Sequence, residues 1–442
     1  MKYTVKDILK IQVAPALGCT EPVAIALGAA AAAALLSGEE ITSIEVSVDP
    51  NIYKNGMAVS IPGSGGLSGL DTAAALGLFG GDPALRLEVL ETVDDDAVAR
   101  ALKFIEAGNV KVNLLADRRG LYIKTVVRAG ERQAESVIQD IHDNIVSLSV
   151  DGEPVKSVPF LKEQVEEKDK GDLQAMEEWL KERRVSELLE LVDGMDKQDR
   201  DFIKEGVDVN LRLADYGLKH GSGLGVGRTL ERLVRQKLIK RDMILAARIL
   251  TSSASDARMA GVKLPAMSSA GSGNHGLTAV LPIWAVKDYV ECDIETVIEA
   301  ICLSHIITAY VKAQTGRLSA VCGCSIAAGA GATAGITYLL GGDMTHIAGA
   351  IKNLTEDLAG VICDGAKAGC SLKLSTAAGT AVQAALFSLQ GVYVQPTDGI
   401  IGLSPEQTMQ NIGTLSTEGM IETDRTILNI MLNKFMEGDA LK

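Results

Sequence analysis

The chain has 442 residues, of which 43 are Lys or Arg and 57 are Asp or Glu, so its net charge is −14. Affinity for polyphosphate comes mainly from cations that neutralise phosphates, so an acidic chain without a basic block argues against nucleic acid and anionic membranes as partners. Aromatic residues are only 4%, against 47% hydrophobic residues and 45 glycines. This composition excludes a disordered chain and is typical of helices packed closely through small side chains.

Two stretches of the sequence bear on secretion and membrane insertion. Residues 1–15 carry charges among their apolar residues and lack the continuous apolar run of a signal peptide. Residues 318–342 carry no charge, but their Gly, Ala, Ser and Thr content makes a weak apolar span without aromatic anchors. We therefore expect a buried helix or helix pair there, no membrane insertion, and a cytoplasmic protein.

The first 150 residues predict a compact α+β unit. Residues 5–14 and 23–37 are expected to be helices, the second apolar all round and therefore buried. Residues 41–50 alternate apolar and polar side chains like a half-buried strand, and Lys54-Asn55-Gly56 then predicts a turn into the next strand. Further strands are predicted at 86–92, 110–115, 121–128 and 145–149, and further helices at 71–79, 95–107 and 131–138.

The remaining chain predicts a mostly helical region. The string EEKDKGD at 166–172 is expected to be a linker, and the amphipathic string at 176–192 a helical connector. From about residue 225 nearly every segment is helix-like, with glycine-rich breaks. The predicted fold class is α+β, with a mostly α-helical C-terminal catalytic domain, joined by the N-terminal helices, and a smaller inserted α+β domain. The predicted domains are N-terminal helices that pack on the helical domain (1–40), an α+β domain (41–160) and a helical catalytic domain that carries the cysteine cluster (161–442).

The first cluster with chemical potential is Gly18-Cys19-Thr20-Glu21-Pro22, between two predicted helices. Thr20 suits an N-cap and Pro22 the first helical turn, so one interpretation is a purely structural helix start. A cysteine at this point also feels the positive end of the helix dipole, which favours the thiolate. Cys19 is therefore a candidate base or nucleophile.

The second cluster consists of cysteines. The chain has seven, an odd number in a long chain, which argues against a disulfide framework. Four of them lie in two segments, Cys322-Gly-Cys324 and the turn from Cys363 to Cys370. The CxxC or Cys/His pairs of structural zinc sites are absent, whereas iron–sulfur ligation tolerates varied spacing. The alternative is that these cysteines are small buried hydrophobic residues.

The third cluster is the string SSAGSGNHG at residues 268–276, preceded by Arg258. Closely spaced glycines let backbone N–H groups approach an anion, and hydroxyl and amide groups add directional hydrogen bonds, which suits a substrate α-carboxylate. The alternative is an ordinary flexible loop. The part SGNHG is also similar to the carboxylate loop of pyridoxal-phosphate serine/threonine dehydratases, but the chain lacks their upstream Ser-Phe-Lys context and their alternating β and α units.

Taken together, these clusters resemble the iron–sulfur L-cysteine desulfidase family, which is related to the α chains of iron–sulfur L-serine dehydratases. The resemblance covers essentially the whole chain. It rests on five ordered strings, PALGCTEPVAIAL (15–27), DPNIYKNGMAVSIPG (49–63), SASDARMAGVKLPAMSSAGSGNHG (253–276), RLSAVC (317–322) and VICDGAKAGCSLKLST (361–376).

The resemblance implies a pyridoxal-independent lyase that breaks the Cβ–S bond of L-cysteine to give sulfide, ammonia and pyruvate, with a [4Fe–4S] cluster as Lewis acid. By motif position, Cys322, Cys363 and Cys370 would hold three irons and leave the fourth open for substrate. Cys324 falls where the family pattern does not demand cysteine, so either thiol of the Cys322/Cys324 pair could bind iron, and we favour Cys322.

The roles of the other residues follow from the reaction. Removing an α-proton without an electron sink is difficult, so the departing sulfur must become a better leaving group. Cys19 is the candidate base, with a role as fourth cluster ligand as the alternative. The substrate carboxylate is expected to meet the string that contains Ser272, Gly273, Asn274 and His275, with Arg258, Lys54 and Asn55 as further candidates.

Other interpretations of the sequence stay open. Within the enzyme class, the same cluster could dehydrate L-serine or a related β-substituted amino acid. From a different class, the protein could be a non-catalytic iron–sulfur sensor or binding protein, or a small-molecule binder with inert cysteines. The expected partner is a small amino-acid substrate, and a helical protein rich in Ala and Gly is also compatible with a homodimer.

Overall fold

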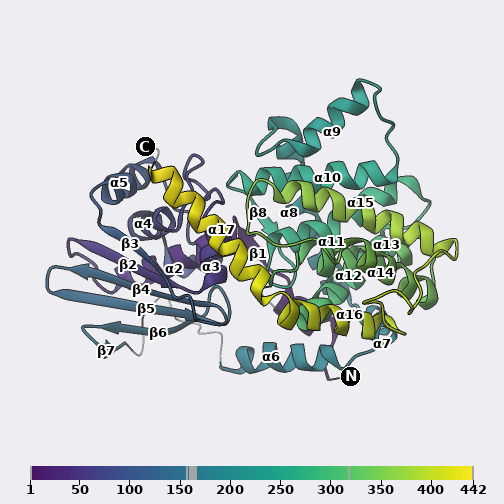
Figure 1. Cartoon of the computed structure of the whole chain (residues 1–442), viewed down its shortest axis with the longest axis horizontal. Helices are drawn as coiled ribbons and strands as arrows, with labels where there is room; N and C mark the ends of the chain where they lie inside the picture. The colour runs from purple at the N-terminus through teal and green to yellow at the C-terminus, as the bar shows by residue number, and fades with distance from the viewer. Residues whose placement is uncertain (1, 156–157, 159–166, 317–318, 441–442) are drawn as a thin grey trace.

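The computed structural model describes residues 2–155, 158, 167–316 and 319–440. Figure 1 shows a sheet with its helices on one side of the molecule and a larger helical body on the other. The predicted fold class, α+β with a mostly helical region and a smaller inserted α+β part, is confirmed.

The α+β part is built on a six-stranded mixed sheet in the order β3-β2-β4-β5-β6-β7. The pair β2/β3 is parallel and the other neighbours are antiparallel. Its strands are β2 (Ser43–Val48), β3 (Val110–Leu114), β4 (Tyr122–Ala129), β5 (Arg132–Gln139), β6 (Ile145–Val150) and β7 (Glu153–Pro154). Its helices are α2 (Thr20–Ala34), α3 (Pro50–Gly56), α4 (Leu70–Gly80), α5 (Asp95–Glu106) and the 3₁₀ turn η1 (Pro83–Glu88).

Helix α2 forms the centre of this part, packed between α4 and the sheet. Its small residues allow close approach: a Cβ at Gly77 of α4 would overlap the carbonyl oxygen of Ala26, and Ser136 on β5 donates a 2.7 Å hydrogen bond to the carbonyl of Gly28. The prediction that residues 1–40 pack on the helical domain is therefore wrong for α2. Only α1 (Val5–Gln12) of the two N-terminal helices lies in the helical core.

Capping overrides the predicted turn at Lys54-Asn55-Gly56. The Asp49 side chain accepts hydrogen bonds from the backbone N–H groups of Asn51 and Ile52, at 2.8 and 3.2 Å, and Pro50 occupies the first helical position. These signals start helix α3, so the expected hairpin does not form.

Two other local predictions are also wrong. Residues 86–92 form the end of the 3₁₀ helix η1 and the turn that follows it, instead of a strand. Residues 131–138 lie mostly in strand β5 instead of a helix, because Gly130, with a φ of 58°, turns the chain back against β4 and every second side chain of β5 is then buried. Tertiary pairing decides the structure of such short segments.

The helical part surrounds α12, which is almost entirely buried. Its helices are α6 (Glu167–Lys181), α7 (Val185–Glu190), α8 (Lys197–His220), α9 (Val226–Arg235), α10 (Met243–Met259), α11 (Gly273–Val286), α12 (Ile294–Thr315), α13 (Gly329–Leu339), α14 (Met344–Leu358), α15 (Cys370–Leu389), α16 (Pro405–Thr414) and α17 (Ile421–Ala440), with short turns η3 (Leu191–Gly194), η4 (Lys287–Tyr289), η5 (Cys324–Ala328) and η6 (Leu415–Gly419). The linker expected at 166–172 is wrong for 167–172, because α6 begins at Glu167; residue 166 lies outside the described residues.

Among the described residues one helix, α12, is long and apolar enough to cross a membrane, and 78% of its most apolar stretch is buried inside the protein, as in a core helix. The uncharged segment from Cys324 to Leu339 folds as η5 and α13, both buried, which confirms the predicted buried helix for these residues. Residues 317 and 318, the start of the string RLSAVC, lie outside the described residues.

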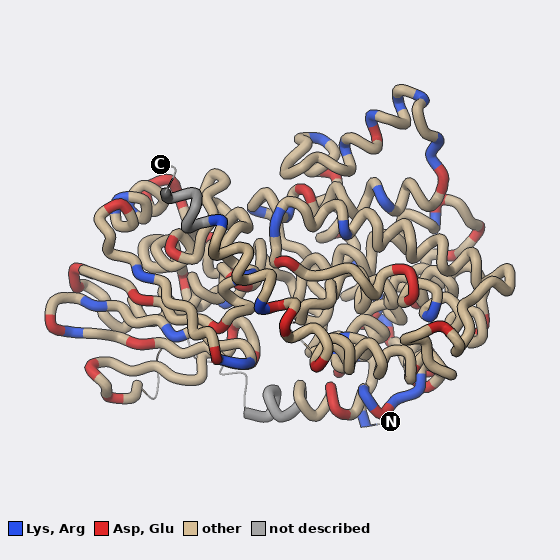
Figure 2. Tube along the Cα trace, viewed as in Figure 1, with Lys and Arg blue, Asp and Glu red and all other residues tan. Residues whose placement is uncertain are grey.

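Contacts at several points join the two parts. Strands β1 (Pro15–Leu17) and β8 (Pro265–Met267) pair antiparallel, which brings the segment before Cys19 beside the segment before Ser272. Helix α17 runs from the helical side toward the sheet (Figure 1), and its Asp424 pairs with Lys54 of α3 at 2.5 Å. Acidic and basic residues are interspersed over both parts (Figure 2).

Candidate functional site

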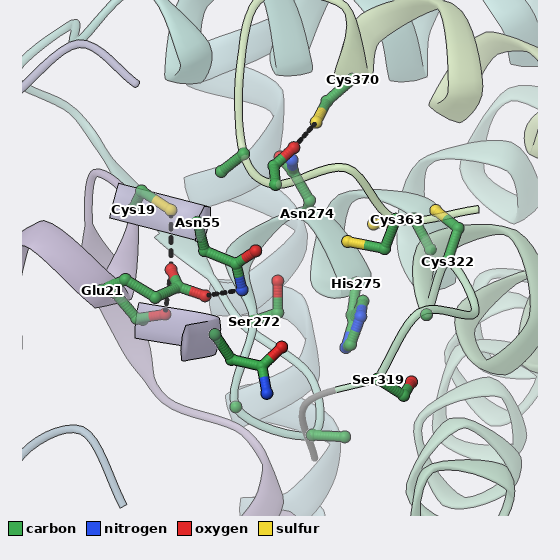
Figure 3. Close-up of a pocket in the computed structure, with 18 of the residues that line it drawn as sticks. Cys19, Glu21, Asn55, Ser272, Asn274, His275, Ser319, Cys322, Cys363 and Cys370 are labelled. Carbon is green, nitrogen blue, oxygen red and sulfur yellow. Dashed lines mark hydrogen bonds between the residues drawn. The ribbon is translucent and has the colours of Figure 1, made fainter. Parts of the chain in front are cut away.

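A cavity of 350 Å³ is lined by residues from both parts of the molecule. The structure brings together most of the predicted site residues, although Cys19 and Cys370 lie 351 positions apart in the chain. The predicted residues that line it are Cys19, Asn55, Arg258, Ser272, Asn274, His275, Cys322, Cys324, Cys363 and Cys370. Figure 3 shows Cys19, Glu21 and Asn55 on one side, Cys322 and Cys363 on the other, and Ser272 and Asn274 between them.

Two predicted residues, Lys54 and Gly273, do not belong to this lining. The Lys54 ammonium group donates to Asp424 at 2.5 Å and to the carbonyl of Cys363 at 3.2 Å, so it connects α3, α17 and the cysteine turn. Gly273 is the first residue of α11, and its backbone lies directly against the Arg258 guanidinium. Each of these two residues contacts a residue of the lining, Lys54 the backbone of Cys363 and Gly273 the side chain of Arg258.

Backbone pairing holds two of the cysteines side by side. Val321 and Ile362 form an antiparallel bridge, in which the N–H of Cys322 donates to Val361 at 2.9 Å and the N–H of Cys363 donates to Ala320 at 2.6 Å. The other two thiols begin helices: Cys324 opens η5, and Cys370 opens α15. The positive end of a helix favours an anion, so these positions suit thiolates.

The four cavity thiols influence one another. Cys324 donates a hydrogen bond to Cys322, which lowers the pKa of Cys322 to about 6 and raises the pKa of Cys324. Burial raises the pKa of Cys363, and it raises the pKa of Cys370 to about 12. The site thus contains one thiol with a lowered pKa and three with a raised pKa, and a bound metal would favour the thiolate form of each.

The donor set fits an iron–sulfur cluster better than a single ion. In the described part of the chain, no three His, Cys, Asp or Glu side chains converge on one ion position. In a cluster each thiolate binds its own iron, so the sulfurs surround a group of atoms instead of one point. Four free thiols around one cavity, one buried and three partly buried, match that requirement.

Cys19 does not have the predicted thiolate character. It is itself the N-cap of α2, in place of the predicted Thr20, and its Sγ donates to Glu21 Oε2 at 2.8 Å. Burial and the adjacent Glu21 carboxylate raise the pKa of Cys19 well above its ordinary value, and these effects exceed that of Arg258. The predicted influence of the helix dipole is therefore outweighed, and Cys19 is a thiol in this structure.

Glu21 is a functional candidate that sequence reasoning did not single out. Its buried carboxylate accepts hydrogen bonds from Cys19, from Thr20 at 3.2 Å and from the Asn55 amide at 3.0 Å. Burial raises the pKa of Glu21, but the nearby His142 and these donors outweigh it, so the pKa lies below its usual value. The signal was its position in the string GCTEP, two residues after the cysteine.

The wall between the Cys19 and Cys322 sides of the cavity presents groups suited to an anion (Figure 3). Helix α11 begins at this wall, and the side chain of its N-cap, Ser272, makes no capping hydrogen bond. The Arg258 guanidinium is 2% exposed, donates to the Gly18 carbonyl, and keeps its Nε without a partner among the described residues. Unpaired N–H groups of a first helical turn together with a guanidinium form a site for a carboxylate.

Two further buried side chains shape the charge of the cavity. Burial and the nearby Lys312 lower the pKa of His275 to about 3, so its imidazole is neutral at physiological pH. Lys312, on α12, lines the cavity and is 6% exposed. No motif surrounds Lys312, so the sequence carried no signal for it.

A second buried histidine near this wall gives a pH prediction. His305 on α12 lies 3.0 Å from Ser269 Oγ, and burial lowers its pKa from 6.5 to about 4. The folded state therefore binds fewer protons than the unfolded state below pH 6.5, and stability is lost as the pH falls from 6.5 toward 4. Between pH 7.5 and 5 we expect the free energy of unfolding to fall by about 2 kcal/mol more in the wild type than in His305→Gln. The reason is that pH 5 lies about 1.5 units below the pKa of the unfolded state, and each unit corresponds to about 1.4 kcal/mol. Urea denaturation at both pH values measures this difference, and equal losses would contradict it.

Comparisons with known proteins show the family of this chain. The sequence model of the serine dehydratase alpha chain matches residues 87–429. A UPF0597 protein of Desulfatibacillum aliphaticivorans is 64% identical over 440 residues, which covers 99% of this chain and 100% of the relative. UPF0597 proteins of Clostridioides difficile and Geobacter sulfurreducens are 45% and 40% identical, over 96% and 97% of this chain and 98% of each relative.

These matches confirm the resemblance inferred from the five ordered strings, at the level of an iron–sulfur serine dehydratase-like family. The matched range contains Arg258, the start of α11 and all four cavity thiols. The chain belongs to the serine dehydratase alpha chain family.

Proposed function

We propose that the protein is a pyridoxal-independent lyase that carries a [4Fe–4S] cluster and cleaves the Cβ–S bond of L-cysteine. One molecule of water is consumed, and sulfide, ammonia and pyruvate are released. The observation that carries this proposal is that four thiols and a carboxylate-type wall line one cavity of 350 Å³. This volume suits a small amino acid next to its cofactor.

Cys322, Cys363 and Cys370 are the proposed cluster ligands. When bound, the cluster supplies a Lewis-acidic iron that makes the sulfur of the substrate a better leaving group, and its affinity for soft sulfur favours cysteine. Lys54 contributes indirectly, because its hydrogen bond to the Cys363 carbonyl holds the ligand segment against α3 and α17.

The substrate carboxylate is proposed to bind at the start of α11. There the Ser272 side chain, the N–H groups of the first turn and Arg258 supply donors and positive charge. Gly273 leaves the space that the Arg258 guanidinium occupies. Asn274 and the neutral His275 complete this wall without adding a negative charge.

Proton transfer is proposed to run through Cys19 and Glu21. The Cys19 thiol holds its proton toward Glu21 Oε2, so passing that proton to the carboxylate would leave a thiolate able to accept the substrate α-proton. Once the α-proton and the β-substituent have left, the resulting enamine is hydrolysed by water to pyruvate and ammonia. A role of Cys19 as fourth cluster ligand is the alternative and requires the same loss of its proton.

L-serine is the second candidate substrate, with dehydration in place of desulfuration. The observation that favours it is the family match, because the matching family model is that of the serine dehydratase alpha chain. We further propose a reducing compartment, the cytoplasm, because all seven cysteines are free. A homodimer stays a prediction.

Anaerobic purification followed by iron analysis and product assays tests the proposal. We expect about four irons per chain, with sulfide and pyruvate released from L-cysteine. Pyruvate released only from L-serine would move the assignment to the dehydratase. An iron-free protein whose turnover depends on added pyridoxal phosphate would contradict both assignments.

A further inference from the structure

We infer that Glu21 and Asn55 form the binding site for the α-ammonium group of the substrate. The inference rests on the proposed function only in that the substrate is an amino acid. It assigns Glu21 as a substrate-binding residue. It also gives Asn55 a different role from the predicted one of meeting the substrate carboxylate.

The Glu21 carboxylate is held in place by hydrogen bonds from the side chains of Cys19, Thr20 and Asn55. Oε2 accepts from Cys19 and Thr20, and Oε1 accepts from the Asn55 amide. The Glu21 backbone N–H and the nearby His142 also favour the charged form of this carboxylate. Oε1, to which Asn55 donates, is the oxygen on which we place the ammonium group.

The Asn55 side chain adds a second acceptor beside it. Because its Nδ2 must face the Glu21 carboxylate to donate, the orientation of the amide is fixed and Oδ1 points away from Glu21. This Oδ1 is buried and has no hydrogen-bond partner among the described residues, while the side chain, 8% exposed, lines the cavity. An unpaired buried acceptor is costly, so a donor in the cavity is expected to satisfy it.

A third acceptor comes from the carboxylate-binding wall. Asn274 follows Gly273 on α11, is 5% exposed, and its Oδ1 also lacks a partner in the described part of the chain. An α-ammonium group has three N–H donors and sits on the same carbon as the α-carboxylate. A set of acceptors that reaches from Glu21 to the start of α11 therefore matches the layout of an α-amino acid (Figure 3).

Binding of two nearly isosteric, unreactive ligands tests the site. L-alanine carries the ammonium group, and L-lactate has a hydroxyl in its place; neither has a leaving group on Cβ. With anaerobically purified protein and isothermal titration calorimetry, we expect L-alanine to bind at least 10-fold more tightly than L-lactate. In Glu21→Gln the affinity for L-alanine should fall about 10- to 100-fold, while the affinity for L-lactate changes by less than about threefold.

Glu45→Gln is the matched control. Glu45 on β2 also accepts from an asparagine amide, that of Asn113 at 2.8 Å, but it does not line the cavity, so its replacement should leave both affinities unchanged. An equal loss for both ligands in Glu21→Gln would show a merely structural role and overturn the inference. So would unchanged L-alanine binding in that variant, or no preference in the wild type.

These outcomes are distinguishable from failure of the proposed function. Selective L-alanine binding that depends on Glu21, in a protein that releases no sulfide, would keep the ammonium site and reject the desulfidase. Sulfide release with no effect of Glu21→Gln on L-alanine binding would do the reverse.

Discussion

A Cys322→Ala variant is expected to lose bound iron and to turn over L-cysteine more than about 100-fold more slowly than the wild type, since removal of a ligand costs more than removal of a supporting contact. Cys322 is the most acidic of the four cavity thiols, with a pKa of about 6, and its backbone pairing with Val361 places it beside Cys363. Iron per chain after anaerobic reconstitution, the visible absorption of the cluster and sulfide release measure the effect.

Two other cysteines sharpen this test. Cys324→Ala is expected to retain iron, because we assign Cys324 as the donor to Cys322 instead of a ligand. Cys302→Ala is the matched control, since Cys302 is fully buried on α12 and does not line the cavity. If Cys324→Ala lost its iron and Cys322→Ala kept it, the roles of the two thiols would be exchanged.

The sequence was enough to select three clusters that the structure brings to one cavity, but it was not enough to predict several local elements around them. Close spacing and residue type were enough to select the three clusters, because a cysteine pair or a glycine-rich string is rare and chemically specific. That these clusters meet in one cavity depends on pairings such as β1 with β8 and Val321 with Ile362, which join residues distant in the chain. Local patterns carry no information on such pairings.

Where the sequence failed, a contact from elsewhere in the fold decided the outcome. The helix-dipole argument for Cys19 was sound as a local effect, but burial and the Glu21 carboxylate outweigh it. Lys54 was expected near the substrate, yet Asp424, 370 residues later in the chain, draws its ammonium group to the boundary with α17. The sequence of residues 131–138 predicts a helix, whereas pairing with β4 makes most of this segment the strand β5.

The second large effect is expected from adding one methyl group at the start of α11. In Gly273→Ala the new Cβ would overlap Nε of Arg258 and lie 2.8 Å from its Cζ. The guanidinium is 2% exposed and donates to the Gly18 carbonyl, so it must leave the position it holds here and move toward the cavity that it lines. We expect KM for L-cysteine to rise about 10- to 100-fold as the carboxylate loses a charge-assisted contact, with iron content unchanged.

Gly360→Ala is the control for this substitution, because a Cβ at Gly360 would meet nothing within 4 Å. It should leave KM, iron content and the circular dichroism spectrum as in the wild type. The distinction from the cysteine variants is that Gly273→Ala acts on substrate binding and Cys322→Ala on the cluster. If Gly273→Ala lost iron together with affinity, the start of α11 would be supporting the thiols instead of the substrate carboxylate. An unchanged KM would show that Arg258 does not serve the carboxylate at all.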